Sequence, residues 1–591
     1  AQSSVMLWLG YVCARLFGWT VLECLYAGAI VAIPSTTIVV KSFAELRVTG
    51  KLVDLVVGIL LVEDLIAIFL LAILTTLSSG ESLSAPAIAM TAGRLAAFLI
   101  GLLVVGMLIV PRLMRAVMRL NRPETTVVAS VGISFAFALL AIQFGYSVAL
   151  GAFIAGTLVA ESGHPRIVEH AIHGVRDLFA AIFFVAVGML IDPTLVAENW
   201  LGVVVFTLLV IIGEVLAVST AAFLTGYPIR TSVKAGMSLA QIGEFSFIIA
   251  GVGVAAGVVG DYLYPIAVAV SAITTLTTPL LIRSSDKVAS FIDRKLPRSL
   301  QTFGALYASW IEQMRLAPDD RSKAAELRRW IRMLLVDFVL VSAIVIGVSV
   351  QAARLTTFIS DRLGLDRRAS VLVLLLSAAA LAAPFCIGII RNARGLGQAL
   401  AVRVLPTGDA GTLDLGLAPR RALIVTLQLA IVLLLGAPLV AITQPFVPPF
   451  QGAAILAVVL LLLGLNFWRS ATELQGHARA GAQTLVEILA VQARGTSEPA
   501  ADAMLQVHDI LPGLGDPEPI VISDTSPAVG RTLGELNLRS LTGATILAIT
   551  RSNERLVVPS GSERLASGDV LAVAGSHDAI AAARAMLGGT T

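Results

Sequence analysis

Long apolar stretches alternate with short polar loops from Val5 to Phe467. About fourteen of these stretches approach the roughly 17 to 25 residues that a helix needs to cross a bilayer, although some are short or interrupted. From about Pro519 the pattern changes to short alternating runs near residues 520–522, 545–550, 555–558 and 570–574, with helical patterns near 530–536 and 577–587. The chain is therefore predicted to be an all-α polytopic membrane protein with a small C-terminal α+β domain.

The same pattern divides the chain into five parts. A first dense set of spans is followed by a basic amphipathic connector, about four further spans, an amphipathic helical linker and the soluble domain. We expect these parts at residues 1–285, 286–334, 335–467, 468–515 and 516–591.

Composition agrees with a lipid environment, since 57% of the 591 residues are hydrophobic and 14% are charged. Lys and Arg gather in every second loop, which the positive-inside rule assigns to the cytoplasm together with the C-terminal domain. The three cysteines lie in apolar runs and indicate neither a disulfide framework nor a cysteine metal site. The chain has no Walker-type phosphate loop, so transport would draw on gradients rather than on ATP, and we expect no enzyme activity and no nucleic-acid partner.

Glu63 and Asp64 stand next to each other inside the apolar span 52–77. A charged side chain at the bilayer centre costs at least ~2.5 to 3.5 kcal/mol on insertion scales, and such residues normally face a water-filled path or a partner. A structural ion pair with a neighbouring helix is the alternative, but the first set of spans has almost no Lys or Arg in its apolar centres. Burial raises the pKa of a carboxyl group by up to ~3 to 5 units, so a carboxylate in this setting can release a proton near neutral pH and bind a cation instead.

Two polar interruptions resemble broken membrane helices. Ala32 to Thr37 contains Pro34, and Pro removes a backbone donor while Ser35, Thr36 and Thr37 offer oxygen ligands to a cation. Gln241 to Phe245 interrupts a later span with Gln241, Gly243 and Glu244. Two such breaks in corresponding halves indicate a transport site built on inverted repeats; a proline kink and a helix-packing patch are the structural alternatives.

Four ordered motifs together resemble the monovalent cation:proton antiporter family that includes the Kef potassium efflux systems. They comprise residues 31–40, 61–64, 183–193 and 239–245. The resemblance implies inverted repeats with two crossing broken helices, a bacterial inner-membrane location, a homodimer, and Asp64 as the carrier of cation and proton. Because the family core has about thirteen spans, it also implies that roughly three spans precede Ala1.

Two positions depart from the family pattern. Glu63 stands where relatives carry Asp, Asn or Gln, and Glu214 stands where relatives often carry a lysine that pairs with the carboxylate. Glu214 is either a second proton carrier or a protonated structural carboxyl, so stoichiometry stays open. The candidate carriers are Asp64, Glu63, Glu214, Glu244 and Gln241, and the candidate cation ligands are Asp64, Glu63, Ser35, Thr36 and Thr37.

Residues 527–536 and 568–576 are similar to the TrkA-C domain of potassium-conductance regulators, also called RCK_C. In relatives such domains pair and bind small regulatory ligands, which implies a nucleotide as one possible ligand here; a dimerisation module without ligand is the alternative. The expected function is exchange of K+, preferred over Na+, for H+ by alternating access, with gating by a cytoplasmic ligand and no bound cofactor. A ligand-gated cation channel and a non-transporting membrane sensor are the alternatives.

Overall fold

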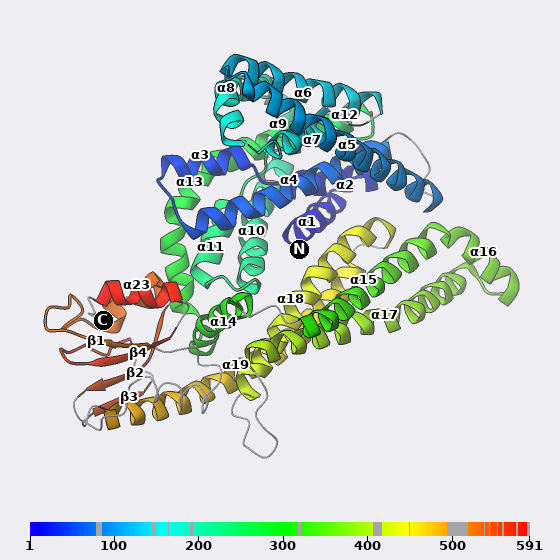
Figure 1. Ribbon diagram of the computed structural model, residues 1–591. Coiled ribbons are helices and arrows are strands. Elements are labelled where there is room, and N and C mark those ends of the chain that lie inside the picture. The colour runs from blue at the N-terminus through cyan, green and yellow to red at the C-terminus, as the bar shows by residue number, and fades with distance from the viewer. Residues whose placement is uncertain are drawn as a thin grey trace.

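The protein is almost entirely helical apart from one small sheet near its C-terminus (Figure 1). The structure, a computed structural model, describes residues 1–78, 85–144, 146, 148–163, 165–189, 193–316, 321–405, 417–447, 450–492, 518–536, 538–542, 544–551, 554–557, 561–574 and 577–587. Within this part of the chain, ten helices are long and apolar enough to cross a membrane. The all-α membrane fold with a small α+β domain is therefore confirmed. The third family motif extends over residues 190–192, and the predicted linker 468–515 extends beyond Gln492, so both lie partly outside the described residues.

Two segments of the chain share the same order of helices, namely one helix, one broken helix and one long helix. This order occurs in α1 (Gln2–Leu16), α2 (Val21–Val31), α3 (Thr36–Glu45) and α4 (Lys51–Ser78), and again in α10 (Trp200–Leu224), α11 (Ile229–Ser238), α12 (Glu244–Ala255) and α13 (Leu263–Lys295). The first half of one broken helix, α2, packs against the second half of the other, α12. This is the arrangement that two inverted repeats produce.

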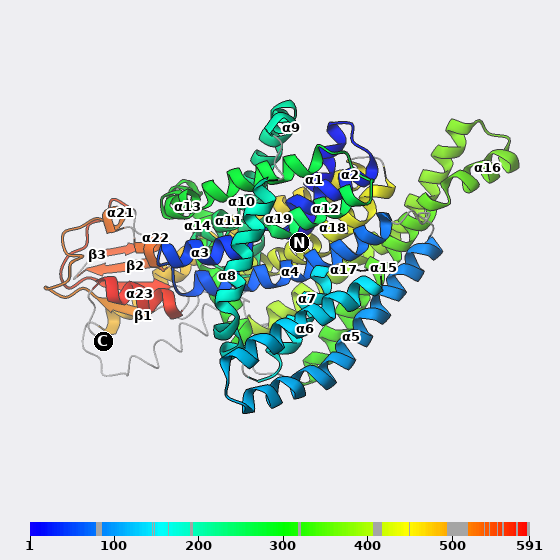
Figure 2. The ribbon, with the colours of Figure 1, turned by 90° about the horizontal axis from the view of Figure 1, so that it is seen from above.

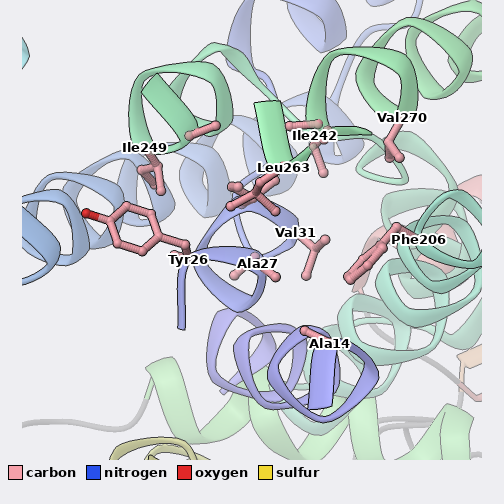
Figure 3. Packing of buried hydrophobic residues seen from close by; sticks show 14 of the residues in the cluster. Ala14, Tyr26, Ala27, Val31, Phe206, Ile242, Ile249, Leu263 and Val270 are labelled. Atoms are coloured by element: carbon pink, nitrogen blue, oxygen red, sulfur yellow. The ribbon is translucent and has the colours of Figure 1, made fainter. Parts of the chain in front are cut away.

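A second group of helices lies between the two repeats in the chain and has its own core. It consists of α5 (Ala85–Arg119), α6 (Pro123–Gln143), α7 (Val148–Ala160) and α8 (Pro165–Met189). The short α9 (Pro193–Glu198) follows in the chain and packs against α10 and α13 of the repeats. The buried cluster of the repeats joins α1, α2, α10, α12 and α13, and Figure 3 shows Ala14, Tyr26, Val31, Phe206 and Leu263 packed within it. Helix α4 contributes Leu71 to this cluster and Ile68 to the cluster of α5 to α8. It therefore lies at the boundary between the two helix groups.

The next part of the chain forms a bundle beside the repeats (Figures 1 and 2). It comprises α14 (Arg298–Leu316), α15 (Arg321–Val350), α16 (Ala352–Leu363), α17 (Arg367–Val404), α18 (Leu417–Thr443), the 3-10 turn η1 (Gln444–Phe446) and α19 (Gln451–Gln492). Among the described residues of this part, four helices are long and apolar enough to cross a membrane. Helix α19 continues from the last span into the first part of the amphipathic linker without a break.

The C-terminal domain is a four-stranded antiparallel sheet in the order β1-β4-β2-β3. Its elements are β1 (Glu518–Val521), α21 (Leu533–Leu536), α22 (Leu538–Thr542), β2 (Thr545–Arg551), β3 (Glu554–Val557), β4 (Val570–Ala574) and α23 (His577–Leu587). Arg551 at the end of β2 forms a bidentate ion pair with the fully buried Asp569 just before β4. Its Nε and Nη2 donate to the two carboxylate oxygens at 2.8 Å each. The predicted strands and the last helix are all present.

Candidate functional site

The two helix breaks meet at residues 32–35 and 239–243. Ser35 ends the first break by capping α3, since its Oγ accepts a hydrogen bond from the Ile38 N–H at 3.2 Å. Across the crossing, the Gly243 N–H donates to the Ile33 carbonyl at 2.9 Å, and the Gln241 side-chain amide donates to the Ser35 carbonyl at 3.3 Å. Backbone N–H and C=O groups that have no partner within their own broken helix thereby form hydrogen bonds to the other broken helix. Burial within a membrane requires such partners, because no water is present to supply them.

Gly243 is the point of closest approach between the breaks. A Cβ atom at this position would lie 2.7 Å from the Pro34 carbonyl oxygen and 2.9 Å from the Ser35 Cα. Both are backbone atoms that cannot rotate away, so only glycine allows the two chains to cross at this distance.

Asp64 lies beside this crossing on α4. Its side chain is partly exposed, and the Thr36 hydroxyl donates to Asp64 Oδ2 at 3.0 Å. Glu244, the first residue of α12, accepts hydrogen bonds from Ser35 Oγ at 2.8 Å and from Thr37 Oγ1 at 3.2 Å, and its charge interacts with that of Asp64. The structure thus brings together two carboxylates and three hydroxyl groups from α3, α4 and α12.

Glu63 lies in different surroundings from its neighbour. It is 3% exposed, and neither of its carboxylate oxygens has a hydrogen-bond partner among the described residues. It lies within electrostatic range of Glu214, a fully buried carboxyl on α10 that accepts a hydrogen bond from the Gln2 side-chain amide at 2.6 Å. Asp64 therefore lies with the hydroxyl groups, whereas Glu63 and Glu214 lie in the interior.

Four further polar residues take part in these contacts and were not anticipated from the sequence: Ser246, Ser271 and Thr278 support the crossing, and Gln2 contacts Glu214. Ser246 Oγ donates to the Ile30 carbonyl at 2.6 Å, and Ser271 Oγ donates to the Ile242 carbonyl at 3.2 Å. Thr278 Oγ1 donates to Gln241 Oε1 at 3.3 Å, while Gln2 contacts Glu214 as described above. The sequence pattern that could have indicated Ser271 and Thr278 is the spacing of Ser271, Thr274 and Thr278, which places three hydroxyl groups on one face of α13.

We expect Gly243→Ala to lower the rate of any cation–proton exchange by about tenfold or more, because displacement of a positioning element by ~1 Å is enough to disrupt a site. The measurement is proton flux in proteoliposomes under an imposed K+ gradient, with equal amounts of reconstituted protein. Gly251→Ala on the same half-helix is the matched control, since a Cβ there would have no neighbour within 4 Å. Equal rates for Gly243→Ala and the native protein would show that the close crossing is not needed.

The comparisons with known proteins identify two segments. The family model described as sodium/hydrogen exchanger, transmembrane, matches residues 2–283, and the TrkA-C domain model matches residues 520–588. The family that matches the first segment consists of transporters rather than enzymes.

Curated relatives are similar to the first half of the chain. The putative cation/proton antiporter YbaL of Escherichia coli is 29% identical over 296 residues, which cover 49% of this chain and 53% of the relative. K(+) efflux antiporter 5 of Arabidopsis thaliana is 30% identical over 48% of this chain and 50% of its own length. The K(+)/H(+) antiporter subunit KhtU of Bacillus subtilis is 27% identical over 48% of this chain and 70% of its own length. The chain spans about half the length of the first two of these relatives.

Among solved structures, the RCK_C domain dimer of S. agalactiae BusR in complex with c-di-AMP is 32% identical over 12% of this chain and 95% of its own length. Its TM-score is 0.12. Residues 2–283 thus match the model of the sodium/hydrogen exchanger family and are similar to curated cation/proton and K+ efflux antiporters, and residues 520–588 match the model of the TrkA-C domain.

Proposed function

We propose that the chain exchanges a monovalent cation, K+ in preference to Na+, for protons by alternating access in a bacterial inner membrane. The observation that carries this proposal is the position of Asp64, a partly exposed carboxylate beside the crossing of two broken helices, with the Thr36 hydroxyl on it. The curated relatives named as K+ efflux or K+/H+ antiporters support K+ as the cargo.

Asp64 binds either the cation or a proton in this proposal, and the competition couples the two fluxes. Ser35, Thr36 and Thr37 supply hydroxyl oxygens, and hard cations favour oxygen ligands. The position of α4 between two separately packed helix groups allows access to the carboxylate to change when the groups move relative to each other. Gln241 holds the Ser35 carbonyl in place rather than binding cargo.

Glu63 and Glu214 have a separate role in the proposal. Because both are buried away from the hydroxyl groups, they hold protons rather than cations through the transport cycle. Glu63 as a direct cation ligand would require a rotation of α4 in another state of the cycle.

The C-terminal TrkA-C domain is proposed to lie in the cytoplasm and to gate exchange on binding a small ligand. Basic residues at the C-terminal end of α13 and in α14 support a cytoplasmic position, since Lys and Arg are retained on that side. A nucleotide is the proposed ligand class, and a homodimer is the proposed assembly.

The experiment measures proton movement and electrical current together in proteoliposomes with an imposed K+ or Na+ gradient. Coupled exchange moves protons against the cation flow, whereas a channel passes uncoupled current and a sensor passes neither. Proton movement that does not depend on the cation gradient would contradict the proposal.

Competition for one carboxylate also predicts a pH dependence. At pH values below the proton-binding midpoint of the site, the apparent affinity for K+ should fall about tenfold for each unit of decreasing pH, because each unit is worth ~1.36 kcal/mol of proton binding. Above the midpoint it should be constant. The check is a series of K+ titrations of exchange at several pH values; a constant apparent affinity throughout would mean that cation and proton bind to different groups.

A further inference from the structure

The four-helix bundle of α15, α17, α18 and α19 belongs to neither matched segment, yet it contacts the exchanger repeats directly. Helix α18 packs against α1 and α10, and the indole N–H of Trp8 on α1 donates to the Gln444 side-chain oxygen at 3.0 Å. A smaller contact joins α15 to α5. The bundle is therefore attached chiefly to the helix group that contains Gln2 and Glu214.

Helix α14 joins this bundle to the end of α10 through an aromatic cluster. Phe303, Tyr307 and Trp310 of α14 are each at most 1% exposed. On the bundle side, Phe303 meets Phe467 of α19 edge to face, with 4.8 Å between the ring centroids. Aromatic pairs of this geometry add to the stability of a joint beyond the area that they bury.

The other side of α14 contacts the chain where α10 ends. Tyr307 donates its hydroxyl hydrogen to the Leu224 carbonyl at 2.6 Å, and Arg315 donates to the Thr225 carbonyl at 3.1 Å. Gly226 follows with a positive φ of 96°, and a Cβ there would lie 2.5 Å from Ile311 of α14. The carbonyls of Leu224 and Thr225 are among those that the C-terminal end of a helix leaves without an intrahelical partner, so α14 caps α10.

Helix α19 connects the same cluster to the C-terminal domain. It is continuous from Gln451 to Gln492, and its second part lies against β2 and β3 (Figure 1). Its membrane-spanning part, Gln451–Thr472, contains Phe467. Any displacement of the sheet therefore acts on α19, which carries Phe467 of the Phe467–Phe303 contact. The end of α13 also contacts α22, which provides a second and separate link.

We propose that the four-helix bundle and α14 form a transmission element that carries movements of the TrkA-C domain, through α19 and the Phe467–Phe303 contact, to the cytoplasmic end of α10. This role rests on the proposed function, since it explains how a regulatory domain reaches the exchange site. It also assigns a purpose to spans that neither family model covers.

The test compares two neighbouring residues of α19 in the full-length protein. Phe467→Ala removes the ring that meets Phe303, whereas Trp468→Ala removes a ring that is 46% exposed. Each is combined with Asp569→Asn, which breaks the pair with Arg551 and so perturbs the C-terminal domain. The readouts are K+-driven proton exchange in proteoliposomes and hydrogen exchange at the end of α10, residues 217–226.

We expect Asp569→Asn alone to change both readouts by about threefold or more, and to have no further effect when combined with Phe467→Ala. In the Trp468→Ala background its effect should be unchanged. Additive effects of Asp569→Asn and Phe467→Ala, or no effect of Asp569→Asn at all, would overturn the proposal.

If Phe467→Ala does not fold, Tyr307→Phe tests the same joint, because it keeps the ring and removes only the hydrogen bond to Leu224. If the native protein shows no exchange, the proposed function fails, but hydrogen exchange at α10 still decides the transmission route on its own.

Discussion

Asp64→Asn should abolish coupled exchange, with K+-driven proton flux falling by about a hundredfold or more to the level of empty liposomes. Asparagine keeps the size of the side chain and can still accept a hydrogen bond from Thr36, but it can neither release a proton nor neutralise a cation. The loss is therefore of charge rather than of packing, and a factor of this size corresponds to ~2.7 kcal/mol at 1.36 kcal/mol for each tenfold step.

Asp54→Asn is the matched control for this prediction. Asp54 lies in the first turn of the same helix and is exposed, so its replacement should leave the exchange rate within about twofold of the native value. Both variants should elute as the native protein does in size-exclusion chromatography. Undiminished coupled flux in Asp64→Asn would remove the basis of the proposed mechanism, whereas retained current without coupling would favour the channel.

The sequence anticipates the secondary structure of the site because the signals there are local. Pro34 followed by three hydroxyl residues predicts a break in α2–α3, and the structure ends α2 at Val31 and starts α3 at Thr36. The second break is equally visible, since Gly243 interrupts an apolar stretch. The strands of the C-terminal domain follow from alternation and were placed to within about two residues.

The relative orientation of neighbouring side chains was not accessible in the same way. Glu63 and Asp64 are adjacent in sequence and about 100° apart around a helix, so which of them faces the hydroxyl groups depends on how α4 packs. That rotation is decided by residues such as Leu71 and Ile68, which bind α4 into two different cores. Likewise, the contact of Gln2 with Glu214 joins residues far apart in the chain and leaves no periodic trace in either segment.

The continuous course of α19 has a related explanation. The amphipathic pattern after Phe467 differs from the uniformly apolar pattern before it, which suggests a boundary between two elements. A helix changes its polarity where it leaves one environment for another without any break in its hydrogen bonds. The change of pattern therefore marks the edge of the bundle rather than the end of the helix.

Glu244→Ala should lower coupled exchange by roughly tenfold to a hundredfold, because it removes the common acceptor of the Ser35 and Thr37 hydroxyls. Hydrogen bonds to a charged group contribute about 1.5 to 3 kcal/mol each, and losing the equivalent of one such bond in the cation-bound state accounts for this range. The same variant also removes a negative charge that interacts with Asp64, so the apparent affinity for K+ should weaken as well as the maximal rate.

Glu244→Gln separates these two contributions. Its side-chain oxygen can still accept a hydrogen bond from Ser35, but it carries no charge, so a purely geometric role would leave Glu244→Gln close to the native rate and an electrostatic role would make it resemble Glu244→Ala. We expect the second outcome, because the carboxylate lies within range of both Asp64 and the N-terminal end of α12. Asp261→Asn, which changes an exposed carboxylate after α12, should leave exchange unaffected. Native exchange kinetics in both Glu244 variants would show that Asp64 works without a second carboxylate.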